Sequence, residues 1–109
     1  MATYKVHVFI NPFEGREAEF NEWYDAEHVP DVLALPGFLR AERFAVHPLG
    51  DESMRYLTVY EVDADNPGEV LERIRAGQPT FRHSDSVDFS TAVIVATSPI
   101  GPVVEATAD

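Results

Sequence analysis

Apolar and polar residues alternate along residues 4–10, YKVHVFI, and this period of two predicts a β-strand. The same period recurs over residues 38–46 and 54–62, while residues 87–97 are almost continuously apolar. We therefore expect four strands, and we expect the last to be central in the sheet or covered on both faces. On the second strand, strict alternation places Phe38 on one face together with Arg40, Glu42 and Phe44.

The chain between the first two strands has a helical period instead. Aromatic residues recur at three- and four-residue steps from Glu14 to about His28. We expect Pro30 to break this helix and to push Val29 into extended geometry, since proline disfavours the helical conformation of the residue before it. A short helix over residues 31–35 should follow, until Pro36-Gly37 ends it.

A second helix is expected between the third and fourth strands. Asn66 provides a side-chain cap, and Pro67 occupies the first helical position, where its missing N–H costs nothing. The helix should cover residues 68–76, with three apolar side chains directed inward: Val70, Leu71 and Ile74.

The resulting order, β-α-β-β-α-β, is typical of a ferredoxin-like α+β fold with a four-stranded antiparallel sheet. We expect one domain over residues 1–109, in which residues 98–109 form a C-terminal tail. Two helices cover only one face of such a sheet, and the other face here carries several apolar side chains. Because a monomer rarely leaves such a face in water, we expect a homodimer that closes it, as in a dimeric α+β barrel.

Charge and composition exclude several classes of partner. The net charge of −11 repels phosphate, so we expect no binding to nucleic acid or to an anionic membrane surface. No apolar stretch is long enough to span a membrane, and we expect no signal peptide, because the first ten residues, MATYKVHVFI, lack its apolar stretch and its small-residue cleavage site. The chain has no cysteine and no glycine-rich phosphate loop. We expect a cytoplasmic protein without a cofactor.

The stretch WYDAEHVPDVLALPGF, residues 23–38, resembles the W-Y-D-x-x-H-x-P-x-x-L-x-x-P-G-F signature of the EthD-like proteins of the dimeric α+β barrel superfamily. This resemblance implies a dimeric barrel with a ligand cavity in each subunit, between the sheet and the helices. The superfamily includes cyclases, isomerases, lyases, cofactor-free monooxygenases and haem-degrading enzymes. The resemblance therefore implies small-molecule chemistry without naming a substrate.

His28 is the leading candidate for a reactive group. On an α-helix it would lie near Tyr24 and Asp25, four and three residues earlier. A nearby carboxylate would raise the imidazole pKa and orient the ring, as a general acid or base requires. Tyr24 would then donate to an oxyanion. In the alternative interpretation, His28 caps the carbonyl groups at the helix end before Pro30, and Tyr24 is a core aromatic.

Further candidates come from the strands and the loops. We expect His7 to be a second polar group in the cavity, although a buried structural histidine would show the same pattern. Arg40 or Arg43 could bind an anionic group of the ligand. His83 lies in the polar loop RHSDS, and His47 in the connection at residues 47–53. The residues expected to contact the ligand are Phe9, Trp23, Arg40, Tyr56 and His83.

We expect no metal site, because the sequence has no H-x-x-x-H pair and Pro30 disrupts the register of Asp25, His28 and Asp31. The function predicted from these features is cofactor-independent acid/base chemistry on a small, largely apolar molecule that is carbonyl-bearing or aromatic. One alternative is a carrier that binds such a ligand without turning it over. Another is a haem-binding protein with His28 or His83 as the axial ligand.

Overall fold

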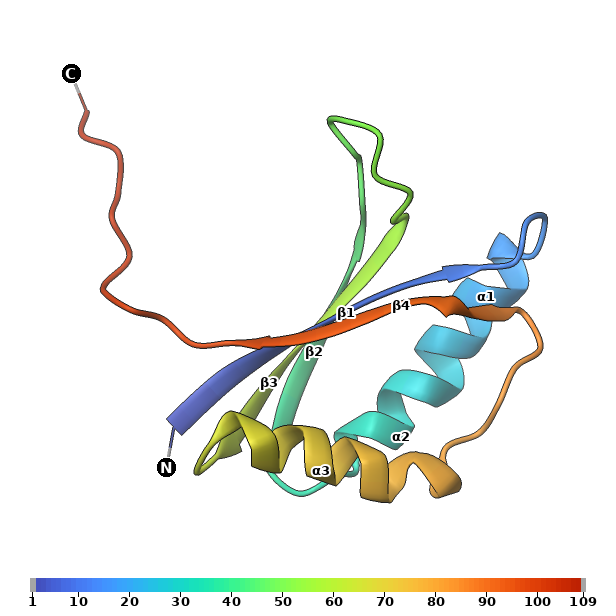
Figure 1. The fold of residues 1–109 in the computed structure, drawn as a ribbon, viewed down its shortest axis with the longest axis horizontal. Coiled ribbons are helices and arrows are strands. Elements are labelled where there is room, and N and C mark those ends of the chain that lie inside the picture. Colours follow the sequence, from blue (N-terminus) through green and yellow to red (C-terminus); the bar gives the residue numbers. More distant parts are fainter. Residues whose placement is uncertain (1, 109) are drawn as a thin grey trace.

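Four antiparallel strands form one sheet in the order β2-β3-β1-β4 (Figure 1). The computed structural model describes residues 2–108. The order of elements confirms the predicted ferredoxin-like α+β fold. The strands are β1 (Ala2–Pro12), β2 (Phe38–Ala45), β3 (Tyr56–Ala64) and β4 (Val87–Thr97).

The helical segment between β1 and β2 does not break at Pro30, contrary to the prediction. It runs from α1 (Glu17–Trp23) through a π-helical turn (Tyr24–His28) into α2 (Val29–Leu33). Val29 is helical, with φ −59° and ψ −48°, and its N–H donates to the carbonyl of Tyr24, five residues back. The wider turn precedes the proline ring, and the helix can therefore continue past a residue that lacks an N–H.

The second helix follows the prediction closely. Asn66 Oδ1 accepts a 2.9 Å hydrogen bond from the N–H of Glu69 and so caps α3 (Pro67–Gly77). Val70 is fully buried, but Leu71 is 42% exposed, so its predicted inward position is wrong. A 3-10 turn (Gln78–Thr80) follows α3 and leads into the loop before β4.

Two predictions about the strands are also corrected. β4 lies at the edge of the sheet rather than at its centre, and Val93, Ile94 and Val95 are each at least 44% exposed. On β2, the pairing shifts by one residue between Phe38 and Arg40. This bulge turns Phe38 into the core while Arg40 lies on the opposite face, so the two do not share a face as strict alternation predicted.

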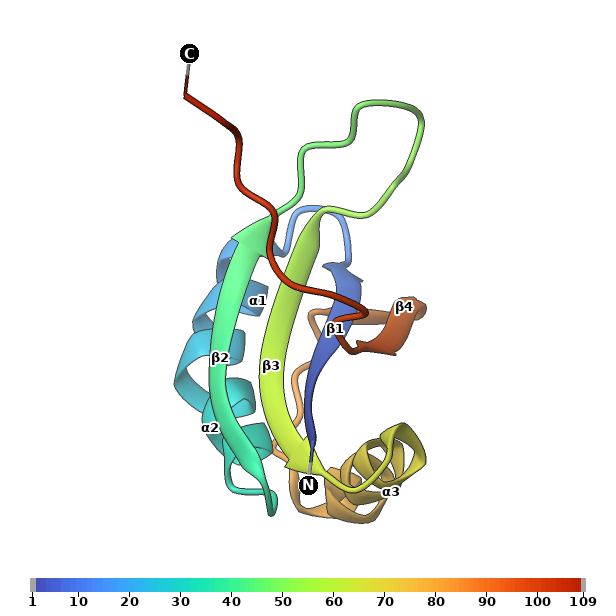
Figure 2. The same ribbon diagram turned by 90° about the vertical axis from the view of Figure 1, so that its left-hand side faces the viewer.

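The helices cover one face of the sheet, and Figure 2 looks onto the other face, which no helix covers. The covered face buries Val6, Tyr60 and Val62 against Val32 and Val70. Residues 98–108 lead away from the sheet (Figure 1). Among the described residues, no helix is long and apolar enough to cross a membrane.

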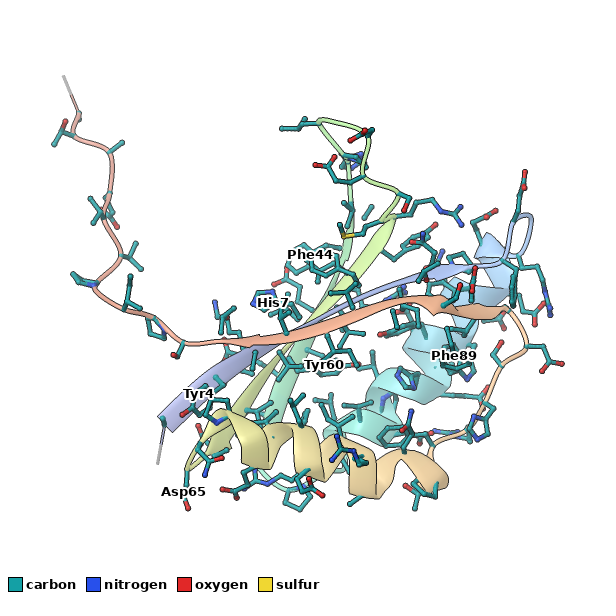
Figure 3. All side chains as sticks on the ribbon, in the orientation of Figure 1. Tyr4, His7, Phe44, Tyr60, Asp65 and Phe89 are labelled. Carbon is teal, nitrogen blue, oxygen red and sulfur yellow. The ribbon has the colours of Figure 1, made fainter. Side chains whose placement is uncertain are left out.

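The uncovered face, which we call the outer face, is defined by side chains that alternate with those of the core. The pairing of His7 with Val59 and Val95 places all three on it, and Figure 3 shows His7 and Phe44 on the side of the sheet opposite Tyr60. Arg40 and Glu61 form an ion pair there. The pairing of the strands places these apolar residues on the outer face: Phe9, Phe44, Leu57, Val59, Val93 and Val95.

Candidate functional site

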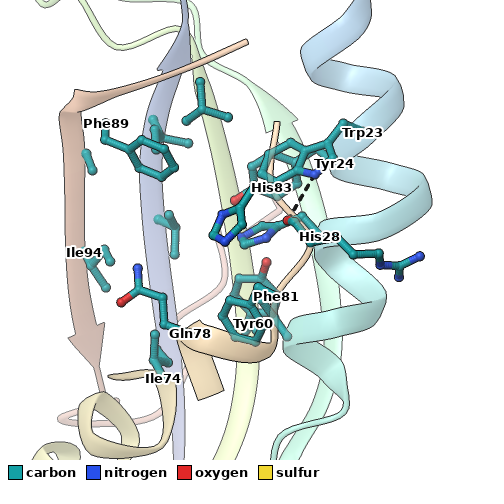
Figure 4. A pocket seen from close by; sticks show the side chains of 16 residues that line it. Trp23, Tyr24, His28, Tyr60, Ile74, Gln78, Phe81, His83, Phe89 and Ile94 are labelled. Atoms are coloured by element: carbon teal, nitrogen blue, oxygen red, sulfur yellow. Dashed lines mark hydrogen bonds between the residues drawn. The ribbon is translucent and has the colours of Figure 1, made fainter. Parts of the chain in front are cut away.

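A cavity of about 170 Å³ lies between the covered face of the sheet and the helical segment (Figure 4). Its wall is mainly apolar, with residues from β1, β4, α2 and α3. Polar side chains reach it from the π turn, from β3, from the 3-10 turn and from the loop before β4. These polar residues are Tyr24, His28, Tyr60, Gln78, Arg82 and His83.

The π turn brings the aromatic residues of the helical segment together. The ring of Trp23 stacks on that of His28, with centroids 4.8 Å apart and an angle of 23° between the planes. Tyr24 meets His28 edge-on, with centroids 4.9 Å apart. Residues five apart in a regular α-helix point about 140° away from each other. The wider turn is therefore what allows Trp23 to stack on His28.

His28 lies among these rings and that of Phe81, whose centroid is 5.6 Å away. Its Nδ1 is buried and has no hydrogen-bond partner among residues 2–108. Burial lowers the pKa of His28 from 6.5 to about 4, and the negative charge of Asp31 offsets only part of this effect. His28 is therefore a neutral imidazole near pH 7, which can donate or accept a hydrogen bond.

The hydroxyl groups of Tyr24 and Tyr60 are buried, and neither has a hydrogen-bond partner in the described part of the chain. Burial is the main cause of the raised pKa of Tyr24; the nearby hydroxyls of Thr58 and Tyr60 oppose it, but neither forms a hydrogen bond of normal geometry with Tyr24. Burial, the larger effect, raises the pKa of both phenols above the ordinary value of 10. Both therefore remain protonated donors at physiological pH.

Arg43, which pairs with Thr58 across the sheet, packs against the ring of Tyr24. Its guanidinium carbon lies 4.3 Å from the centre of the Tyr24 ring. The same group donates to Asp25 Oδ1 at 3.0 Å and to Asn21 Oδ1 at 2.9 Å. Asp25 is thus paired with Arg43 and exposed to solvent, and it does not orient His28 as predicted.

Arg82 fastens the loop before β4 to the helical segment. Its backbone N–H donates to Asp31 Oδ2 at 2.8 Å, and its Nη2 donates to Asp31 Oδ1 at 2.8 Å. Its carbonyl accepts a 3.3 Å hydrogen bond from the indole N–H of Trp23. These contacts hold the loop beside the cavity, with His83 in its wall.

A second, more open hollow of about 480 Å³ adjoins the cavity, and Trp23 and His83 line both. Four carboxylates line this hollow: Glu19, Glu22, Glu27 and Asp85. Arg16 binds Glu19 at 2.6 Å and Arg82 lies 3.7 Å from Glu27, so part of this charge is compensated. The remaining negative field should oppose the approach of anionic ligands.

Residues 1–97 match the sequence model of the family described as Domain of unknown function (DUF4286). The chain belongs to this family. No curated protein matches the sequence. The fold of this chain is similar to those of several solved structures, two of which are described next. Their sequence identities to this chain are 11% and 14%, so the similarity concerns the fold alone.

One is a candidate monooxygenase from Shewanella loihica PV-4, with a TM-score of 0.62 and 11% identity over 93% of this chain and 97% of that chain. The other is an EthD family protein from Bacillus halodurans C-125, with a TM-score of 0.60 and 14% identity over 92% of this chain and all of that chain. The EthD-like fold implied by the motif is thereby supported.

The structure of the DUF4286 chain brings some of the predicted residues together and separates others. Tyr24 and His28 line the cavity, as do Trp23 and His83. His7 does not: it lies on the outer face, where its Nε2 is 2.9 Å from Thr97 Oγ1. The predicted ligand contacts Phe9, Arg40 and Tyr56 are also absent from the cavity wall.

The cap interpretation of His28 is wrong, because the helix continues beyond it to Leu33. Sequence analysis missed Tyr60, which lies two residues after the buried Thr58 and therefore on the same face of β3. It also missed Arg82, whose importance depends on a contact with Asp31 across 51 residues of chain. Among residues 2–108, no cluster of three or more potential metal ligands is present.

Proposed function

We propose that this protein is an enzyme that acts, without a cofactor, on a small, largely apolar molecule with a carbonyl or aromatic group. The observation that carries the proposal is the set of three buried, unpaired polar atoms around one apolar cavity: the Tyr24 hydroxyl, His28 Nδ1 and the Tyr60 hydroxyl. Buried polar groups normally have partners, so unpaired groups around a cavity favour a bound ligand. The fold shared with a candidate monooxygenase is consistent with this.

The chemistry proposed for His28 is proton transfer next to a carbonyl group. A neutral imidazole can take a proton from such a carbon, while a phenol donor stabilises the negative charge that develops on the oxygen. With a pKa of about 4, His28 is a weak base. It would therefore suit a substrate whose proton is already acidic, or a step in which the imidazole donates a hydrogen bond.

The low pKa of His28 also favours a second candidate, a carrier that binds the ligand without turning it over. A neutral histidine and two phenols can hold a ligand by hydrogen bonds alone. Haem binding through His28 or His83 remains a third proposal. A Soret band after addition of haem to the purified protein would support it.

The outer face supports the proposal of a homodimer. Val93 and Val95 are 46% and 44% exposed on it, and Phe44 is 40% exposed. A contiguous apolar surface on a sheet is stabilised when a second copy covers it. We infer that two chains pack through their outer faces and leave one cavity in each subunit.

Native mass spectrometry of the purified protein would identify a small molecule that co-purifies with it. Turnover of that molecule is then compared between the wild type and His28→Ala, and we expect a loss of about 10²- to 10⁴-fold. His47→Ala is the matched control, because His47 is exposed in the connection after β2. Full turnover by His28→Ala would contradict the role of His28, and retention without turnover by the wild type would indicate the carrier.

A further inference from the structure

Two phenol groups from different parts of the chain meet at the cavity. Tyr24 belongs to the π turn and Tyr60 to β3, and both line the cavity (Figure 4). Their side chains are 2% and 1% exposed. After the larger effect of burial, Tyr24 also raises the pKa of Tyr60, so the two hydroxyls are neighbours, although they do not form a hydrogen bond of normal geometry with each other.

We propose that the hydroxyls of Tyr24 and Tyr60 bind one oxygen atom of the ligand together, and that this atom is a carbonyl or enolate oxygen. The inference rests on the proposed function of the same cavity and deepens it by adding Tyr60 and a ligand class. A carbonyl oxygen has two lone pairs, so it can accept one hydrogen bond from each phenol.

The surroundings of the two hydroxyls favour a neutral ligand that becomes negative during reaction. A buried hydroxyl without a partner is unfavourable, and two such groups beside one cavity indicate that a ligand supplies the acceptor. Two fixed donors stabilise an enolate oxygen more than a ketone oxygen, because the enolate carries more negative charge. Tyr60 is then a residue that binds the ligand oxygen on which negative charge develops, in the cavity that His28 also lines.

The test uses two probes of nearly the same shape, acetophenone and ethylbenzene, of which only the first has a carbonyl group. Calorimetric titration should show that the wild type binds acetophenone more tightly than ethylbenzene. Tyr24→Phe and Tyr60→Phe should each weaken acetophenone binding by about 3- to 10-fold and leave ethylbenzene binding unchanged. Tyr56→Phe is the matched control, because Tyr56 lies on the same strand but outside the cavity wall.

A spectroscopic measurement separates ligand contact from a structural role. The infrared C=O stretch of bound acetophenone should shift to higher frequency in each of the two cavity variants, because one hydrogen bond is lost, and it should not move in Tyr56→Phe. Since neither hydroxyl has a partner in the fold, both cavity variants should melt at or above the wild-type temperature.

Equal binding of the two probes, or no binding of acetophenone, would overturn the inference. An unchanged C=O stretch in Tyr60→Phe would overturn it as well, and so would a lower melting temperature of that variant. Its failure is distinguishable from failure of the proposed function, which depends on His28→Ala and the co-purified molecule. Loss of turnover in His28→Ala together with unchanged acetophenone binding in Tyr60→Phe would leave the enzyme proposal intact and remove only the role of Tyr60.

Discussion

The indole ring of Trp23 stacks on the imidazole ring of His28, with centroids 4.8 Å apart. Trp23 is the only tryptophan of the chain, and it also lines the cavity. Its fluorescence therefore reports on the protonation state of one identified histidine. Stacking on an indole and packing against Tyr24 and Phe81 keep the imidazole away from water, which is the main cause of its low pKa.

We expect the emission of Trp23 to fall as the pH is lowered, with a midpoint near pH 4, because protonated imidazole quenches an indole ring in contact with it. The titration is made at low protein concentration, since the pI is about 4.6. In His28→Gln this transition should disappear. A midpoint near 6.5 in the wild type would show that the ring is solvated, and would contradict its burial.

The same burial makes stability depend on pH. The folded-state pKa of about 4 lies below the value of 6.5 expected in the unfolded chain, so the unfolded state binds the proton more readily. Stability from the neutral ring is present above pH 6.5 and is lost as the pH falls toward 4. Between pH 7 and pH 5, the free energy of unfolding should fall by about 2 kcal/mol more in the wild type than in His28→Gln. Urea unfolding at both values measures this difference, and parallel losses would contradict it.

Much of the fold could be predicted from the alternation of apolar residues. The helical register that decides which side chains lie beside His28 could not. The residues Trp23, Tyr24 and His28 were identifiable as a group. An α-helical register, however, placed Asp25 beside His28, whereas the π turn places Trp23 there and leaves Asp25 with Arg43. A π turn depends on how the chain around a proline packs, and no local residue pattern specifies it.

Long-range contacts account for the other missed features. The bulge on β2 reverses the face of Arg40 relative to Phe38. Because residues 38–44, FLRAERF, mix apolar and charged side chains on both faces, this shift in the alternation could not be recognised in the sequence. Edge and central strands can have the same composition, so the apolar run of β4 could not reveal its position at the edge. The proposed homodimer would cover the outer side of this strand, where Val93 and Val95 are exposed.

The contact between Asp31 and Arg82 should control the mobility of the loop before β4. Asp31→Asn removes the charge that holds both the side chain and the backbone N–H of Arg82. We expect faster amide hydrogen exchange in residues 81–86, with little change in the strands. Glu72→Gln is the control, because its 3.0 Å ion pair with Arg75 is exposed on α3. Unchanged hydrogen exchange in Asp31→Asn would contradict this prediction. It would show that the hydrogen bond from Trp23 and the packing of the loop are enough to hold the loop in place.

The acidic hollow beside the cavity should discriminate against anions. Benzoate has nearly the size of acetophenone but carries a negative charge. At low salt we expect benzoate to bind at least about tenfold more weakly than acetophenone. The reason is that the net charge of −11 and the carboxylates of Glu22 and Asp85 repel it. Added salt should reduce the difference by screening the repulsion. Tighter binding of benzoate than of acetophenone would show that the positive charge of Arg82 outweighs these carboxylates.

The outer face should determine the oligomeric state. Light scattering of the wild type at micromolar concentration should give twice the chain mass of 12.2 kDa. Val95→Lys places a charge on this face, opposite His7, and should shift the mass toward one chain because a buried, unpaired ammonium opposes association. Val104→Lys is the control, since Val104 is 89% exposed in the tail. A wild-type mass of one chain over this concentration range would contradict the dimer, and the apolar outer face would then need another partner to cover it.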